Sequence, residues 1–304
     1  MDLAVLEQLA KGVITPQGLS LILLFVLWFK IPRNYGIQDP GTAIASRWRV
    51  LIAPLIVAIV VLLSWPIIFT LSFPPADTFA RTPWIWLGAA FALMGVNAMS
   101  HRLFRILAVA AVVLIAAPFV VPAAQLKLIP TPQLALQAGL LVACCFSSAS
   151  WIPDIAEKSP RSASIISCIT LTGACQALIL GFSSLKLGQA VGMLGAIAGA
   201  FMFLTIWKNR DLSGKGLDAT FSAASILILF AGVHSTETVR PWLYIFLIAA
   251  IPLVSLLIYK IPLSSPRLRA IFAVFAAIAM VAATLAIAFV NRPVDEYQTS
   301  TAIR

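Results

Sequence analysis

The chain consists of long apolar stretches separated by short polar ones. A helix that crosses a bilayer needs about 20 mainly apolar residues, and windows of this kind recur along the whole sequence. Ten of them are predicted as transmembrane helices, at residues 13–31, 49–72, 83–99, 104–123, 133–152, 163–183, 187–207, 219–236, 241–259 and 269–291. The pattern therefore predicts an all-α fold, a polytopic integral membrane helix bundle of about ten transmembrane helices.

The basic residues test the order of these windows, because cytoplasmic loops of membrane proteins collect Lys and Arg. The larger group of basic residues follows the odd-numbered windows: Lys30, Arg33, Arg47, Arg49, Arg102, Arg105, Lys158, Arg161, Lys208, Arg210, Lys215, Lys260, Arg267 and Arg269. The smaller group lies on the opposite side: Lys11, Arg81, Lys127, Lys186, Arg240, Arg292 and Arg304. The odd-numbered loops are therefore predicted to be cytoplasmic, and both termini extracytoplasmic.

Composition supports a single membrane domain. Apolar residues make up 61% of the chain and charged residues 11%, against about 25% charged residues in globular proteins. We expect an outer-surface N-terminal segment at 1–12, one transmembrane domain at 13–291 and a polar C-terminal tail at 292–304. The acidic start "MDLAVLEQLAKG" lacks the features of a cleavable signal peptide, so a plasma (inner) membrane location without processing is expected.

Three successive windows each have a face of small or weakly polar residues. At helical spacing the first contains Gln137, Cys144, Ser148 and Trp151. The second contains Ser164, Cys168, Thr172 and Cys175, with Gln176 adjacent. The third, "GQAVGMLGAIAGAF", contains Gly188, Gly192, Gly195 and Gly199.

These faces have two interpretations. Lipid is as apolar as leucine, so helices in bilayers associate through small residues and side-chain hydrogen bonds. Helix packing is therefore the favoured interpretation, above all for the four glycines. The alternative is a substrate path lined by Gln137, Ser148, Thr172 and Gln176.

The aromatic residues follow the membrane surfaces, because Trp and Tyr prefer the headgroup level. Trp242 and Tyr244 fall at the outer end of the ninth window, and Tyr259 falls at its inner end. Trp65 lies inside the second window, next to Pro66, and is expected to face a neighbouring helix.

Metal, haem and redox chemistry have no support in the sequence. All four cysteines lie inside predicted spans, where thiols behave as small hydrophobes and the thiolate is disfavoured. His101 and His234 belong to opposite surfaces, so they form neither a haem clamp nor a zinc motif. We predict no cofactor and no metal ligand.

Catalysis and ion coupling also lack the groups they need. No Asp, Glu, Lys or Arg is central in a predicted span, which disfavours proton-coupled transport. No serine-nucleophile motif is present, and "WIPDIAEKSPR" and "WKNRDLSGKGLD", with Asp154 and Asp211, are interpreted as solvated loops. No run of basic residues marks a nucleic-acid arm. An enzyme is therefore disfavoured, no catalytic residue is assigned, and no nucleic-acid partner is expected.

Three hypotheses for function remain open. The length and the number of spans resemble those of the drug/metabolite transporter superfamily, although no motif carries a family assignment. The first hypothesis is a transporter or permease-like protein for a neutral or lipid-like solute. The second is a non-catalytic membrane subunit or assembly partner, and the third is a lipid-modifying enzyme. The expected partners are the lipid bilayer and either a membrane protein or a second copy of this chain.

The predicted orientation is testable with a reporter fused after Arg304. Because the charge distribution places both termini outside, a reporter that is active only in the cytosol should give no signal there, and a periplasmic reporter should be active. The same pair of reporters fused in the Lys208–Lys215 loop should give the reverse result. A strong cytosolic signal after Arg304 would contradict the orientation.

Overall fold

The computed structural model describes residues 7, 14–24, 56–67, 69, 78–97, 102–121, 123–208, 214–235, 240–262 and 265–291. These residues are almost entirely helical and contain no strand, which confirms the all-α fold class. The predicted C-terminal tail at 292–304 lies outside the described residues, as does the segment 1–12 apart from Glu7. His101 and Asp211 also lie outside them.

Helices occur at the positions of the predicted windows. The first two are Ile14–Leu24 and Ile56–Ile67. They are followed by α3 (Thr78–Asn97), α4 (Arg102–Val120), α5 (Ala123–Leu128), α6 (Thr131–Lys158), α7 (Pro160–Gln176), its continuation η1 (Ala177–Gly181), α8 (Leu185–Lys208), α9 (Gly214–Ser235), α10 (Pro241–Lys260) and α11 (Pro266–Val290). The short α5 lies between the fourth and fifth predicted windows, where the sequence predicts a loop.

Five of the described helices are long and apolar enough to cross a membrane. They are Thr131–Ala156, Pro160–Gly181, Leu185–Trp207, Pro241–Lys260 and Pro266–Val290. They coincide with the fifth, sixth, seventh, ninth and tenth windows. Helices of this length and composition are what an integral membrane protein requires.

Two predicted loops are shorter than the sequence indicates, because helices continue beyond the apolar windows. Helix α6 runs through Pro153 to Lys158, so Asp154 is an exposed residue on a helix and not in a loop. Helix α7 begins directly after it, where the Ser159 hydroxyl accepts a hydrogen bond from the backbone N–H of Ser162. Asp218 likewise lies within α9. Apolarity marks where hydrocarbon ends, whereas a helix ends where a cap satisfies its free backbone groups.

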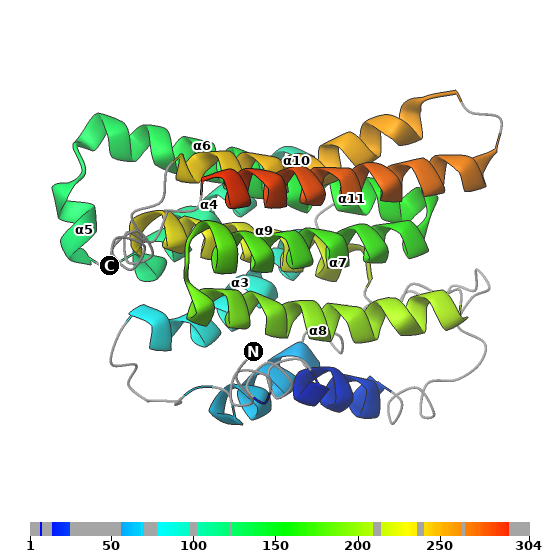
Figure 1. Ribbon diagram of the computed structural model, residues 1–304, viewed down its shortest axis with the longest axis horizontal. Coiled ribbons are helices and arrows are strands. Elements are labelled where there is room, and N and C mark those ends of the chain that lie inside the picture. The colour runs from blue at the N-terminus through cyan, green and yellow to red at the C-terminus, as the bar shows by residue number, and fades with distance from the viewer. Residues whose placement is uncertain are drawn as a thin grey trace, which may run out of the picture.

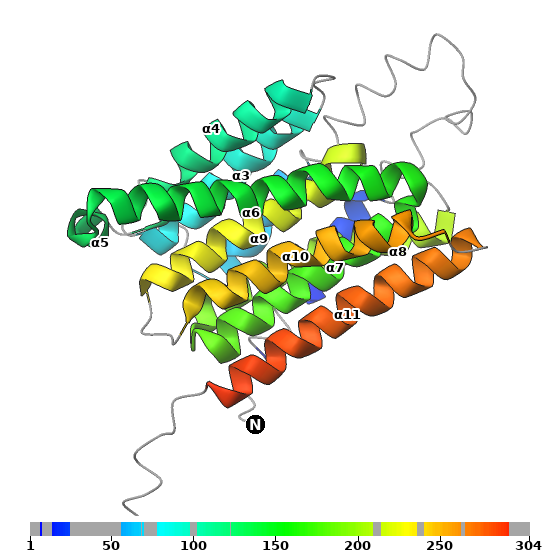
Figure 2. The ribbon, with the colours of Figure 1, turned by 90° about the horizontal axis from the view of Figure 1, so that it is seen from above.

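The helices form a bundle with α7 and α9 at its centre (Figures 1 and 2). Helix α9 packs on α3, α4, α6, α7, α8 and α10, and α7 packs on α6, α8, α9, α10 and α11. In Figure 2, α4 and α11 lie at opposite edges of the bundle. Residues from the two central helices therefore have protein on most sides.

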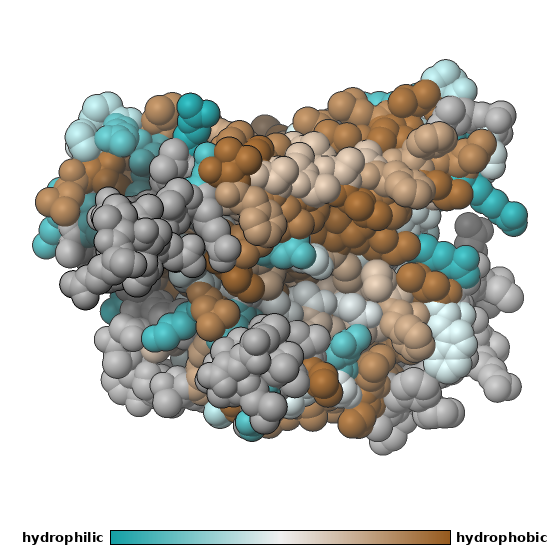
Figure 3. Space-filling model, viewed as in Figure 1, coloured by the Kyte–Doolittle hydropathy of each residue, from teal (hydrophilic) through white to brown (hydrophobic). Residues whose placement is uncertain are grey.

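The edge helices present large apolar side chains outward. Helix α11 is the most apolar of the five helices that are long enough to cross a membrane, yet only 17% of the residues in its apolar stretch are buried. Phe272 and Phe275 on α11 are exposed, as are Leu107 and Ile115 on α4. Figure 3 shows apolar residues over the face that α11 forms. An outward apolar surface of this extent suits contact with lipid and not with water.

The interior contains polar groups but no charges in the part of the chain that is described. Its buried polar residues are Ser20, Ser64, Thr82, Gln137, Ser147, Ser148, Ser162, Ser164, Ser167, Thr170, Thr205, Thr220, Ser222, Ser225, Ser255 and Thr284. Trp65 is fully buried, and its ring lies against that of Phe69 four residues further along. The core is therefore apolar with an uncharged, hydroxyl-rich component.

Candidate functional site

The four residues of the predicted path occupy different environments. Gln137 and Ser148 are buried on α6, about 16 Å apart along its axis at 1.5 Å per residue. Gln176, the last residue of α7, is half-buried and its Oε1 atom is fully buried. Thr172 is exposed, and its hydroxyl donates to the carbonyl of Cys168 one turn earlier, at 2.8 Å. The structure thus encloses polar groups of three of the residues and leaves Thr172 outside.

The polar face of α6 contacts α9 and α10. The Ser147 hydroxyl donates to the Ala249 carbonyl of α10 at 2.8 Å. The Cys145 thiol contacts the Ala223 carbonyl of α9, with Sγ and O 3.7 Å apart. These bonds hold three helices together next to Ser148, which is itself fully buried.

The polar residues of α7 contact other helices. The Cys175 thiol donates to the Gly188 carbonyl of α8 at 3.1 Å. The Ser167 hydroxyl lies 3.5 Å from the Ser222 hydroxyl of α9. Hydrogen bonds therefore connect α6 to α9 and α10, and α7 to α8 and α9, so that α9 is a partner of both helices.

The glycines of α8 lie along its contact with α7 and with the helix Ile14–Leu24. A Cβ atom at Gly188 would overlap Cγ1 of Ile179 and lie 3.4 Å from the Cys175 carbonyl. The corresponding atoms at Gly192, Gly195 and Gly199 would meet their nearest neighbours at 3.5, 3.7 and 3.8 Å, which is ordinary contact. Gly188 is therefore the position where the helices approach too closely for a side chain.

Helix α7 ends in a π-turn. In η1 the backbone N–H of Phe182 donates to Ala177 O at 3.0 Å, five residues back, and that of Ser184 donates to Leu178 O at 2.9 Å. Ser183 then has a left-handed backbone, with φ 51°. A π-turn widens a helix locally and often occurs at functional sites.

Aromatic rings pack tightly against this turn. A Cβ atom at Gly181 would lie 2.8 Å from Cζ of Tyr244 and 3.2 Å from its Oη atom. A Cβ at Gly232 of α9 would lie 3.2 Å from Cδ1 of Phe182. The rings of Phe182 and Tyr244 are themselves 5.4 Å apart. We call Gln176, Gly181, Phe182 and Tyr244 the π-turn cluster.

Several buried polar atoms of the described residues have no hydrogen-bond partner there. Four of them belong to α6 and the π-turn cluster: Gln137 Oε1, Ser148 Oγ, Gln176 Oε1 and Tyr244 Oη. Others occur on Ser20, Ser64, Gln125, Thr205, His234 and Tyr259. Leaving such a group unpaired costs about 1–3 kcal/mol, so each one needs a physical explanation.

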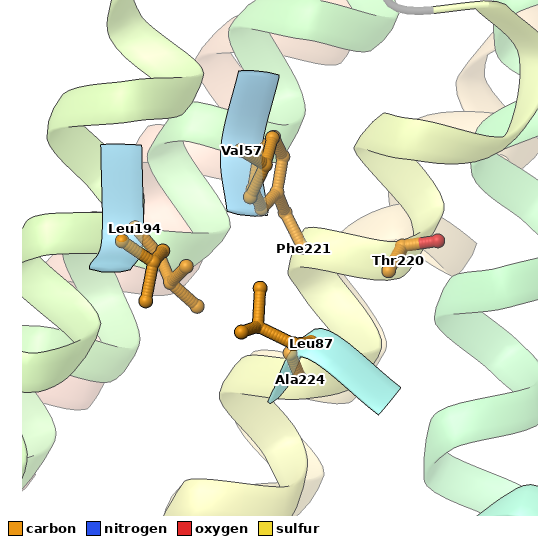
Figure 4. A pocket seen from close by; sticks show the side chains of 7 residues that line it. Val57, Leu87, Leu194, Thr220, Phe221 and Ala224 are labelled. Atoms are coloured by element: carbon orange, nitrogen blue, oxygen red, sulfur yellow. The ribbon is translucent and has the colours of Figure 1, made fainter. Parts of the chain in front are cut away.

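The space between α8, α9, α3 and the helix Ile56–Ile67 is not a solute site. It is lined by Val57, Val61, Leu87, Leu194, Thr220, Phe221 and Ala224 (Figure 4) and has a volume of about 10 Å³. Figure 4 shows the Thr220 hydroxyl pointing away from the other side chains. A volume of about 10–15 Å³ is the least that a water molecule needs, so this gap is a packing defect among apolar residues.

Sequence reasoning missed the π-turn cluster. It placed Tyr244 at the outer end of the ninth window; in the structure Tyr244 lies in the first turn of α10 and is 0% exposed, a burial that the sequence did not indicate. The available signal was Gly181, which makes room for a ring, followed by the helix-breaking "FSS". Among the described residues no group of three His, Cys, Asp or Glu is placed to hold a metal ion. No protein-family model matches the chain, and the comparison with curated proteins found no match either.

The glycine contacts predict different costs for two neighbouring substitutions. Gly188→Ala should destabilise the protein by about 1–3 kcal/mol, because the added methyl group displaces Ile179 and overpacks the α7–α8 contact. Gly195→Ala meets only Leu171 Cβ at 3.7 Å and should be neutral or stabilising by up to about 1 kcal/mol. Thermal unfolding of the two purified variants in detergent measures the difference. Equal unfolding temperatures would contradict the close approach at Gly188.

Proposed function

We propose that the protein is a transporter or permease of neutral or lipid-like solutes, with ten transmembrane helices and both termini on the outer side of a plasma (inner) membrane. The agreement between helices and predicted windows supports the number of spans. The end of the bundle where α6 and α10 end and α11 begins carries Lys158, Lys260 and Arg267, all exposed. That clustering supports a cytoplasmic position for this end.

The observation that carries the proposal is the set of unpartnered polar atoms inside the bundle. Gln137 Oε1 and Ser148 Oγ lie on α6, and Gln176 Oε1 and Tyr244 Oη lie at the π-turn. A solute that passes between the helices can supply the missing hydrogen bonds, one group after another. Bonds made and broken in turn allow a solute to enter and leave, whereas a single strong site would retain it.

The absence of buried charge in the described interior favours an uncharged solute. The buried polar side chains there are all hydroxyls and amides. An ion moved out of water needs compensating charge, or it pays a solvation penalty far above that of a neutral polar group. Hydroxyl and amide groups suffice for a solute with hydroxyl, carbonyl or amide groups.

Thr172 serves as the internal control for this path. Its hydroxyl is exposed and already donates to the Cys168 carbonyl. The Thr172 hydroxyl therefore has no free hydrogen-bond donor to offer a solute. We exclude Thr172 from the substrate path that the sequence predicts. Gln137, Ser148 and Gln176 remain.

Flux through the purified protein in liposomes tests the proposal. The probes are glycerol, urea, a neutral amino acid and a fluorescent phospholipid, each followed against empty liposomes. We expect flux of at least one probe. Gln137→Leu and Ser148→Ala should each lower it by about tenfold, because the loss of one hydrogen bond to the solute is worth about 1.4 kcal/mol.

Thr172→Val is the matched control, and this change removes no solute contact. The flux should therefore stay within about twofold of wild type, well short of the tenfold loss that corresponds to about 1.4 kcal/mol. Wild-type protein that moves none of the four probes would contradict transport and favour a subunit whose polar groups only pack helices. Equal loss in all three variants would contradict the assigned path.

A further inference from the structure

The π-turn η1 lies where several helices of the bundle meet. It continues α7 and packs on α8, α9, α10 and α11. Three glycines allow this: Gly181 within the turn, Gly188 opposite Ile179, and Gly232 opposite Leu178. A change in the turn is therefore felt directly by four neighbouring helices.

Tyr244 is buried at this turn in a way that packing alone does not explain. It is 0% exposed, and its Oη atom has no hydrogen-bond partner. A phenylalanine would fill the same volume, make the same ring contact with Phe182 and avoid the cost of an unpaired hydroxyl. The hydroxyl is thus a cost to stability in this structure.

The turn also has the features of a point of motion. The π-turn replaces the regular hydrogen-bond pattern of α7 with bonds spanning five and six residues. It is followed by Ser183, which is exposed and left-handed. Departures of this kind from α-helical geometry kink helices and are frequent at functional sites. Movement of Phe182 away from Tyr244 would make the Tyr244 hydroxyl accessible to a solute.

Building on the transport function proposed above, we propose that Tyr244 and the π-turn Ala177–Gly181 form a solute-binding gate. The gate lies at the end of the bundle where α7 ends and α10 begins. The Tyr244 hydroxyl donates its proton in a hydrogen bond to a hydroxyl or carbonyl oxygen of an uncharged solute. The ring of Phe182 covers the solute's apolar side. In the closed arrangement Phe182 lies against Tyr244 and blocks the passage, and binding replaces this ring contact by a hydrogen bond.

Tyr259 provides a matched control on the same helix. It is 6% exposed, and its hydroxyl is also buried without a partner. It lies near the opposite end of α10, about 22 Å away at 1.5 Å per residue. No π-turn adjoins it in the described chain. Tyr244→Phe and Tyr259→Phe therefore remove the same hydroxyl group, the first at the proposed gate and the second away from it.

Liposome flux and thermal unfolding of these two variants test the gate. For the probe that wild-type protein moves, Tyr244→Phe should lower flux by about tenfold, the loss of one solute hydrogen bond of about 1.4 kcal/mol. Its unfolding temperature should be equal to that of wild type or higher, because an unpaired hydroxyl has been removed. Tyr259→Phe should leave flux within about twofold of wild type, a difference well below the loss of one hydrogen bond.

The outcomes separate this inference from the function on which it rests. Normal flux in Tyr244→Phe alongside normal wild-type flux would overturn the gate and leave transport standing. An unfolding temperature several degrees below wild type would assign the hydroxyl to a structural bond and also overturn the gate. Wild-type protein that moves no probe would overturn transport itself, and the gate with it.

Discussion

The helix bundle depends on close contact between α7 and its neighbouring helices, because lipid supplies no hydrophobic force that would draw the helices together. Association in a bilayer relies on van der Waals contact and on hydrogen bonds between helices. Gly173, Gly181, Gly188 and Gly232 each lie where a Cβ atom would come within about 3 Å of a neighbouring side chain. Without these glycines α7 would be displaced from its neighbours, and the hydrogen bonds of Ser167 and Cys175 would lengthen with it.

The same constraint explains where the polar groups lie. Away from helix ends and internal prolines, the backbone groups of a spanning helix are satisfied within that helix, so most of the remaining polar groups are side chains. Many of these bond back to their own helix, as Thr170 does to Ile166 O at 2.8 Å and Thr284 to Met280 O at 2.8 Å. Ser147 and Cys145 instead connect α6 to its neighbours. A few do neither, and among these we assign function to the groups on α6 and at the π-turn.

Hydropathy predicted most of the helix positions because spanning helices require long apolar runs, and this holds whatever packs against them. It failed at the ends of α6 and α9, where Asp154 and Asp218 lie on helices that continue past the apolar run. Which faces meet was harder to predict. A helix that is apolar all round has no direction set by hydrophobicity, so the sequence did not indicate that Cys145 and Ser147 of α6 bond to α9 and α10. The burial of Tyr244 was not predicted, because the headgroup preference of tyrosine says nothing of the space that a distant glycine can create.

The central claim is that the uncharged polar interior next to Ser148 is reached from water during function, while the α11 surface faces lipid. Thiol accessibility tests it, with Ser148→Cys and Phe275→Cys made separately in a chain whose four native cysteines are replaced. Both variants are exposed, in intact membranes, to a small water-soluble thiol reagent. The account predicts reaction at position 148, slowed by a transported solute, and no reaction at position 275. Reaction at 275 with none at 148 would contradict it.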